Sequence, residues 1–129
     1  MSISAVTSSD APSGPGPYSP AIRAGDLVFV SAQSPIDPDS HEIQGSDIET
    51  QTRRALDNVA ALLEAAGAKF SQIVKVNAYL ADPEDYERFN AIYESYFDMD
   101  PKPARTTVSV VHIWDSRQRI KVECIAYVG

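Results

Sequence analysis

Cysteine, long apolar runs and blocks of basic charge are all scarce or missing in this sequence. Its one cysteine, Cys124, excludes an internal disulfide framework and a metal site built from several cysteines. No apolar run approaches the roughly 20 residues of a membrane-spanning helix, and no charged-then-apolar secretory leader opens the chain. We therefore expect a cytoplasmic protein that has no membrane partner.

Positive charge is also in short supply. The chain has 11 Lys and Arg against 18 Asp and Glu, which gives a net charge of −7. Binding a phosphate backbone needs a stripe of cations that releases counterions. The nearest candidate, Arg117-Gln118-Arg119-Ile120-Lys121, alternates in the way a β-strand does. We expect no nucleic acid partner.

The residues that are present suffice for one domain with one core, because 43% of the 129 residues are hydrophobic. Residues 1–15 are rich in Ser, Ala, Gly and Pro and lack apolar periodicity, which predicts a flexible N-terminal arm. Residues 16–129 form the predicted single domain.

Apolar stripes with a spacing of three and four residues predict two helices. The first has capping-box spacing at Ser46-Asp47-Ile48-Glu49 and a terminating glycine at Gly67. The second begins at Asp82-Pro83, a cap residue followed by proline. Its stripe consists of Tyr86, Phe89, Tyr93 and Phe97. Asn90 lies among them, where its amide either orients a loop or reaches a pocket, since a buried amide needs partners.

Segments of β-branched or alternating residues predict four strands, at 27–31, 73–80, 106–111 and 119–127, with an extra short strand near the N-terminus. The first of them is expected to be buried. With both helices on one face of a mixed sheet, the fold class is α+β. The second face carries Tyr79 and Ile125 among polar residues, which favours burial against copies of the same chain.

Three residues attract attention before any family is considered. Arg105 follows Pro103 at the start of a strand, where a planar guanidinium could grip a carboxylate with two parallel hydrogen bonds; the alternative is an ordinary surface arginine. Tyr18 stands between two prolines and is either a packing residue or the hydroxyl-bearing wall of a pocket. Ser31 has no nearby His-Asp pair in the sequence, so a catalytic triad is not supported.

Several short motifs, taken in order, resemble the RidA/YjgF family over residues 14–128. They are Gly16-Pro17-Tyr18-Ser19, the segment 27–33, Gln51-Thr52-Arg53, Leu56-Asp57-Asn58, Ala65-Ala66-Gly67, Asn90-Ala91-Ile92-Tyr93, Tyr96-Phe97, Pro103-Ala104-Arg105 and the segment 122–126. The resemblance implies a chorismate-mutase-like fold and a homotrimer with ligand clefts between subunits. It also implies hydrolysis of reactive 2-imino acids, formed from enamines, to 2-keto acids and ammonia.

The resemblance also assigns roles to single residues. Arg105 matches the arginine that grips the substrate carboxylate, and Tyr18, Ser31 and Asn90 match pocket positions. Thr107 stands where the family often has cysteine or another small residue. Imine hydrolysis needs carboxylate anchoring, a positioned water and control of proton transfer, so no metal or organic cofactor is expected. Neither histidine of the chain, His41 or His112, has a partner at metal-ligand spacing.

Three departures from the family pattern bear on catalysis. Ala32 replaces a glycine, and Lys121 stands where a glutamate typically helps to position the water. Glu123, on the same strand face, could substitute for that glutamate; Lys121 could instead redirect the pocket to another acid. The connection 112–117 lacks the usual Leu-Pro-Lys and is one residue longer.

Two functional classes therefore stay open. One is an imine or enamine deaminase with Arg105, Glu123 and Lys121 as its catalytic candidates. The other is a non-catalytic carboxylate-binding or chaperone-like trimer. A further enzymatic variant would use the same cleft on another unsaturated or cyclic acid.

Overall fold

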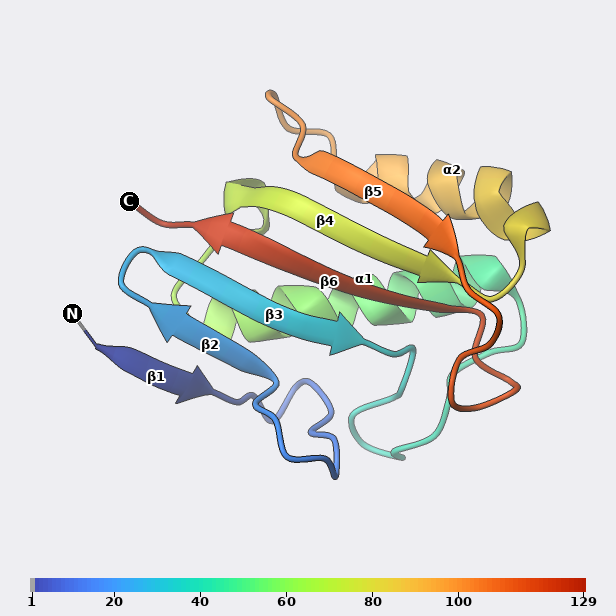
Figure 1. The fold of residues 1–129 in the computed structure, drawn as a ribbon, viewed down its shortest axis with the longest axis horizontal. Helices are drawn as coiled ribbons and strands as arrows, with labels where there is room; N and C mark the ends of the chain where they lie inside the picture. The colour runs from blue at the N-terminus through green and yellow to red at the C-terminus, as the bar shows by residue number, and fades with distance from the viewer. Residues whose placement is uncertain (1) are drawn as a thin grey trace.

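A computed structural model describes residues 2–129, across which two α-helices cover one face of a six-stranded sheet (Figure 1). The strands are β1 (Ile3–Val6), β2 (Ala21–Ala24), β3 (Leu27–Gln33), β4 (Ile73–Leu80), β5 (Ala104–Ser109) and β6 (Ile120–Tyr127). The helices are α1 (Ile48–Ala65) and α2 (Tyr86–Tyr96), and single 3-10 turns span Phe70–Gln72 and Pro83–Asp85. The predicted α+β class, with both helices on one face of a mixed sheet, is confirmed.

The spatial order of the strands is β1-β2-β3-β6-β4-β5, and only the β4–β5 pair is parallel. Helix α2 provides the crossover that a parallel pair requires. The last strand, β6, runs through the middle of the sheet between β3 and β4. Residues from the C-terminal end of the chain therefore lie beside residues from both the early and the middle segments.

The first helix begins one residue later than its capping box predicted. Asp47, not Ser46, is the N-cap, and its carboxylate accepts a hydrogen bond of 2.8 Å from the backbone N–H of Thr50. This bond lowers the pKa of Asp47. Gly67 ends the helix as predicted, in the left-handed conformation at φ 83°, which glycine adopts without steric cost.

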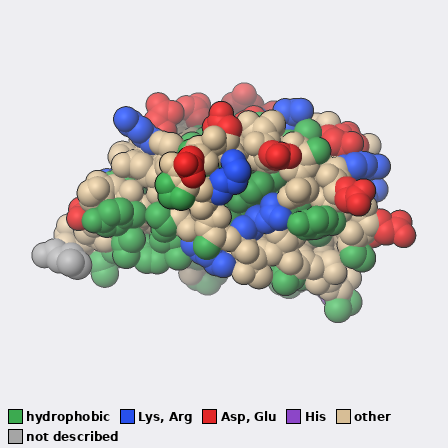
Figure 2. Space-filling model, turned by 90° about the horizontal axis from the view of Figure 1, so that it is seen from above, with side chains coloured by type: hydrophobic (Ala, Val, Ile, Leu, Met, Phe, Trp, Pro, Cys, Tyr) green, Lys and Arg blue, Asp and Glu red, His purple; other side chains and the backbone are tan. Residues whose placement is uncertain are grey.

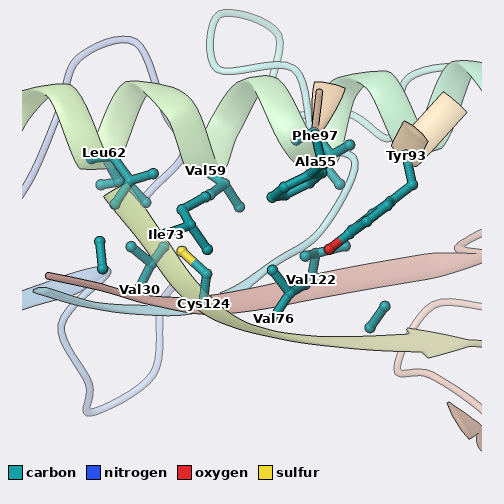
Figure 3. Close-up of a cluster of buried hydrophobic side chains, with 14 of the residues drawn as sticks. Val30, Ala55, Val59, Leu62, Ile73, Val76, Tyr93, Phe97, Val122 and Cys124 are labelled. Carbon is teal, nitrogen blue, oxygen red and sulfur yellow. The ribbon is translucent and has the colours of Figure 1, made fainter. Parts of the chain in front are cut away.

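The core lies between α1 and the sheet, with α2 closing one end. Figure 3 shows Val59 and Leu62 of α1 directed at the strands, above Val30, Val76 and Cys124. Each of the two helix residues is at most 1% exposed. Burying a side chain of this size fully is worth roughly 1.5–3 kcal/mol, so the helix is held mainly by its apolar stripe.

The expected flexible arm over residues 1–15 needs correction at its beginning. Residues Ile3–Val6 form β1, which pairs antiparallel with β2. The N-terminal region thus contributes two strands where the sequence predicted one. Backbone pairing explains this, because β1 satisfies its hydrogen bonds on the edge of β2 while three of its four side chains stay exposed.

Two strand predictions also need correction. The segment 27–31 was expected to be buried, yet Leu27 and Phe29 are 38% and 40% exposed, because only alternate residues of β3 face the helices. In the strand predicted at 73–80, strict alternation with the buried Val76 would place Val74 on the helix face, but Val74 is 46% exposed. An irregularity in pairing between Ile73 and Lys75 shifts the alternation there.

The sheet face opposite the helices, termed here the open face, is rich in apolar side chains. Phe29 pairs with Ile125, and Leu27 pairs with Tyr127. Val108 of β5 adds a further apolar side chain that is 43% exposed. The paired apolar residues of β3 and β6 form exposed apolar surface of a kind typical of a protein–protein interface.

Neither helix within residues 2–129 has the length and apolar character that crossing a membrane would require.

Candidate functional site

Arg105 is held in a fixed orientation by helix α2. Its guanidinium donates 2.7 Å and 2.9 Å hydrogen bonds to Asn90 Oδ1 and to the Tyr86 hydroxyl. The guanidinium carbon also lies 4.6 Å from the centroid of the Tyr93 ring, within the range of a cation–π contact. Arg105 is therefore not an ordinary surface arginine.

The Arg105 side chain borders a cavity of about 270 Å³, lined by Asn90, Tyr93, Glu94, Phe97, Lys102, Pro103 and Arg105. Among residues 2–129, no ion pair of the structure involves Arg105. A guanidinium offers five N–H donors in a fixed fork, and only two of these bonds are made within the chain. The remaining donors leave capacity for a carboxylate.

Asn90 answers a question that the sequence left open. It reaches a pocket and at the same time orients Arg105. Tyr86 and Tyr93 were not predicted as site residues, although their spacing of four and three residues from Asn90 places all three on one side of α2. That spacing, combined with a cation on the neighbouring strand, was the available signal.

Two buried hydroxyls lie on the same side of the sheet as the guanidinium. Thr107 follows Arg105 by two residues on β5, so both side chains share a face. Within the described chain, neither Thr107 Oγ1 nor the Tyr93 hydroxyl has a hydrogen-bond partner. Burial raises the pKa of Tyr93 to about 12, with a smaller opposing effect from the Arg105 charge. Tyr93 thus remains protonated at neutral pH.

The other predicted catalytic residues lie on the open face. Val122 and Cys124 of β6 are buried toward the helices, so Lys121 and Glu123 point the opposite way. Both border a cavity of about 330 Å³, lined by Ala32, Tyr79, Val110, His112, Ile113, Lys121 and Glu123. The expectation that Lys121 and Glu123 share a strand face is confirmed.

Tyr79 connects the two charges of this cavity. Its hydroxyl donates a hydrogen bond to Glu123 Oε1, which is the main reason that the pKa of Tyr79 is raised. The ammonium of Lys121 lies 5.7 Å from the centroid of the Tyr79 ring. Glu123 is therefore held by a neutral donor and has a cation nearby, whereas Lys121 itself carries no acceptor.

Tyr18 and Ala32 also belong to this side of the molecule. Tyr18 is 58% exposed and lies against Gly14 and Gly16, where any Cβ atom would collide with its ring. Tyr18 and Ala32 line a cavity of about 240 Å³, and Ala32 also lines the one that contains Lys121. Tyr18 is thus both a packing residue and a pocket wall.

Within a single chain, Ser31 has a structural role. Its hydroxyl donates a 2.8 Å hydrogen bond to the carbonyl of Ser19, and its backbone N–H donates to the carbonyl of Pro20 at 2.9 Å. These bonds hold the Tyr18 segment against β3. The Ser31 side chain is absent from the walls of the three cavities described above.

The predicted site residues therefore divide into two groups. One half-site, on the side of α2, contains Arg105, Asn90 and Thr107. The other half-site, formed by the open face and its rim, contains Tyr18, Ala32, Lys121 and Glu123. Residues 2–129 contain no group of three or more His, Cys, Asp or Glu side chains placed to hold a metal ion.

Comparisons with known proteins extend over nearly the whole chain. A protein-family model described as Endoribonuclease L-PSP matches residues 8–128. A RutC family protein of Pyrococcus abyssi is 42% identical over 127 residues, which are 98% of each chain. Reactive Intermediate Deaminase A of Arabidopsis thaliana, a chloroplastic protein, is 39% identical over 94% of this chain and 64% of its own. A crystal structure of E. coli TdcF with bound serine is 30% identical with a TM-score of 0.90, and the match covers 98% and 99% of the two chains.

Proposed function

The chain belongs to the YjgF/RidA/RutC family, and from this premise we propose that it hydrolyses reactive 2-imino acids to 2-keto acids and ammonia. The observation that carries the proposal is the orientation of Arg105 by Asn90 and Tyr86 beside a cavity. A guanidinium prepared in this way binds a carboxylate with little further loss of freedom.

The relatives support the same class of ligand. One of them is named for reactive-intermediate deamination, and the structure of another contains bound serine, an amino acid with a carboxylate. A 2-imino acid has the same carboxylate beside the carbon that reacts. Arg105 would hold that group and fix the C=N bond relative to the rest of the site.

Hydrolysis of the imine is balanced by water alone. The oxygen of water adds to C2, and its protons pass to the nitrogen as the C–N bond breaks. Ammonia leaves, the carbonyl of the 2-keto acid forms, and no electrons are exchanged with a cofactor. We assign the orientation of the water to Glu123, because its carboxylate is held by Tyr79 and a charged ammonium cannot accept a proton.

The placement of the two half-sites supports an assembly of more than one copy of the chain. Arg105 points toward α2, whereas Glu123 and Lys121 point to the open face, so one chain cannot direct both at one small molecule. We propose a homotrimer in which the apolar open face is buried and each cleft combines the Arg105 half-site of one subunit with the Glu123 half-site of the next. The pocket roles of Tyr18, Ser31, Ala32, Asn90 and Thr107 belong to the same proposal.

Lys121 supports a second candidate function. Its cation replaces the carboxylate that the family typically uses, so the chain could bind carboxylates without hydrolysing imines, or act on another unsaturated or cyclic acid. An RNA-cleaving role, which the description of the family model names, has less support. The net charge is −7, and Figure 2 shows Lys and Arg interspersed with Asp and Glu on the face in view.

The test is the release of ammonia from 2-iminopropionate, generated from alanine by an amino-acid oxidase. We expect release to be faster with the protein than without it, and Arg105→Ala to remove the acceleration. Acceleration that persists in Arg105→Ala would contradict the assigned anchor. Binding of 2-keto acids without any acceleration would favour the non-catalytic alternative.

A further inference from the structure

The connection between β5 and β6 carries a tryptophan whose side chain is almost fully exposed to solvent. Ile113 is 7% exposed, whereas its neighbour Trp114 is 97% exposed. The buried isoleucine anchors the connection, and the next residue then projects its indole into solvent. Trp114 is also the one tryptophan of the whole chain. A large aromatic side chain presented in this way is typical of a contact surface.

The backbone around Trp114 is tied down on its C-terminal side. The buried side chain of Gln51 donates to the carbonyl of Arg117 at 2.8 Å and accepts from the backbone N–H of Arg119 at 2.7 Å. Gln118, also buried, donates to Ser34 Oγ at 2.7 Å. These bonds fix the connection against α1 and the end of β3. The exposed indole is therefore carried by an ordered support.

Trp114 stands at the wall of a cavity of about 500 Å³, larger than either half-site cavity. This volume lies within the range of roughly 300–1,000 Å³ that small-molecule sites occupy. Its apolar and aromatic walls include Pro15, Tyr18, Ile36, Ile43, Ile113 and Trp114. Such walls suit an apolar group far larger than a methyl.

This cavity adjoins the Glu123 half-site. Lys121 and Ile113 line both the 500 Å³ cavity and the 330 Å³ cavity that contains Glu123 and Tyr79. A molecule whose reacting carbon lies beside Glu123 can therefore extend past Lys121, along its aliphatic stem, to the indole. The residues that line the larger cavity, Tyr18 and Trp114 among them, would determine the direction in which such a molecule extends.

We propose that the space between Tyr18 and Trp114 is the side-chain pocket of the substrate, and that the chain prefers 2-imino acids with a bulky aromatic side chain. The inference rests on the proposed imine hydrolysis and adds the substrate class. Trp114 is then a specificity-determining residue, because offset or edge-to-face contact with a second ring rewards an aromatic substrate. Oxidation of an aromatic amino acid at its Cα–N bond is the class of reaction that supplies such a substrate.

The kinetic test compares imines made by an amino-acid oxidase from phenylalanine and from alanine. We expect the wild-type kcat/KM to be higher for the phenylalanine-derived imine. Trp114→Ala should lower that value about tenfold and leave the alanine-derived imine within about twofold. Trp114→Phe should restore most of the loss. Val111→Ala is the matched control, since Val111 is equally exposed in the same connection at 97% but does not line the cavity.

A binding test does not depend on catalysis. Because Trp114 is the one tryptophan, its fluorescence reports on the pocket of the full-length protein. We expect saturable quenching or a blue shift with 3-phenylpropanoate and no change with propanoate.

The outcomes separate the two proposals. The pocket proposal would be wrong if Trp114→Ala lowered kcat/KM equally for both imines, or if it left kcat/KM for the phenylalanine-derived imine unchanged. Identical fluorescence responses to the two carboxylates would also contradict it. If no imine is hydrolysed but 3-phenylpropanoate alone changes the emission, the catalytic proposal fails and the aromatic pocket stands.

Discussion

Arg105 and Glu123 lie on opposite faces of the same sheet, and the structure supports them in different ways. Arg105 is hydrogen-bonded to Asn90 and Tyr86 of α2, packs over the Tyr93 ring and borders a cavity. Glu123 has one hydrogen bond from Tyr79 and shares its cavity with a cation. The first half-site thus orients a guanidinium within one chain, whereas the second lies on the exposed open face. In the proposed trimer, the carboxylate anchor is complete in one subunit, and the next subunit would close the half-site that orients the water.

The largest expected effect comes from keeping the two half-sites apart. Phe29→Glu places a charge on the open face, next to Ile125, without disturbing the buried face of β3. We expect a folded species of about 14.0 kDa that has lost imine hydrolysis, because a buried unpaired carboxylate opposes association. Sedimentation at micromolar concentration measures the mass.

Val111→Glu is the control for charge alone, because Val111 is exposed outside the sheet. That variant should assemble as the wild type does. A wild-type protein that sediments as a 14.0 kDa monomer would refute the trimer.

Removing the anchor should have the next largest effect. Arg105→Ala should lower kcat/KM for imino acids about 10³-fold, since charge-assisted hydrogen bonds are worth roughly 1.5–3 kcal/mol each and two are lost. The far-ultraviolet circular dichroism spectrum should not change, because the side chain contributes little to the core. Arg53→Ala, which removes an exposed cation on α1, is the matched control. Equal 2-keto acid affinity in Arg105→Ala and the parent would exclude Arg105 as the anchor.

The roles of Glu123 and Lys121 separate in a pair of variants. If Glu123 orients the water, Glu123→Gln should lower kcat about 10²-fold with little change in KM, the lower end of what a positioned base contributes. Lys121→Glu should then bring no gain. A rise in hydrolysis in Lys121→Glu, with no loss in Glu123→Gln, would show that a carboxylate at position 121 is the one that matters. Tyr79→Phe removes the hydrogen bond that holds the Glu123 carboxylate and should lower kcat less than Glu123→Gln does.

The smallest effect concerns Cys124, which follows Glu123 on β6 and therefore points to the opposite face of the sheet, toward the helices. Burial raises the pKa of this thiol from 9.0 to about 12, with a smaller contribution from the Glu123 charge. The unfolded chain therefore loses this proton at lower pH than the folded one. Stability linked to the thiol is complete below pH 9 and is lost as the pH rises from 9 toward 12.

Removing this thiol in Cys124→Ala should therefore reduce the loss of unfolding free energy between pH 9 and pH 10 by about 1 kcal/mol, somewhat less than the equivalent of one full pKa unit, because half of the unfolded thiols are already ionised at pH 9. Chemical denaturation at the two pH values measures the difference. At pH 7 the native thiol should resist alkylation, while Cys124 of the denatured chain reacts. An unchanged pH dependence in Cys124→Ala would mean that another group dominates this range.

Local pattern alone was sufficient for the existence of the two helices and the main strands and for most of the residues that face the core. The three-and-four spacing of α1 and the alternation in β6 each follow from the geometry of one element, so neighbouring residues carry the information. The family motifs likewise marked Arg105, Tyr18 and Asn90 as candidates one by one, with Glu123 as a substitute for the glutamate that Lys121 replaces. The prediction that the apolar segment 27–31 is buried was wrong for Leu27 and Phe29, because their exposure depends on what covers the open face.

Only the tertiary structure decided which of these residues meet. The pairing of β6 between β3 and β4 joins residues forty or more positions apart in sequence, and no local pattern specifies such a register. The tertiary structure places Arg105 of β5 in contact with Tyr86 and Tyr93 of α2. It also brings Glu123 to Tyr79 on the other face and Trp114 to the wall of a cavity. The chain's own sequence named the chemical groups, and the long-range packing of β6 and α2 divided them into two half-sites.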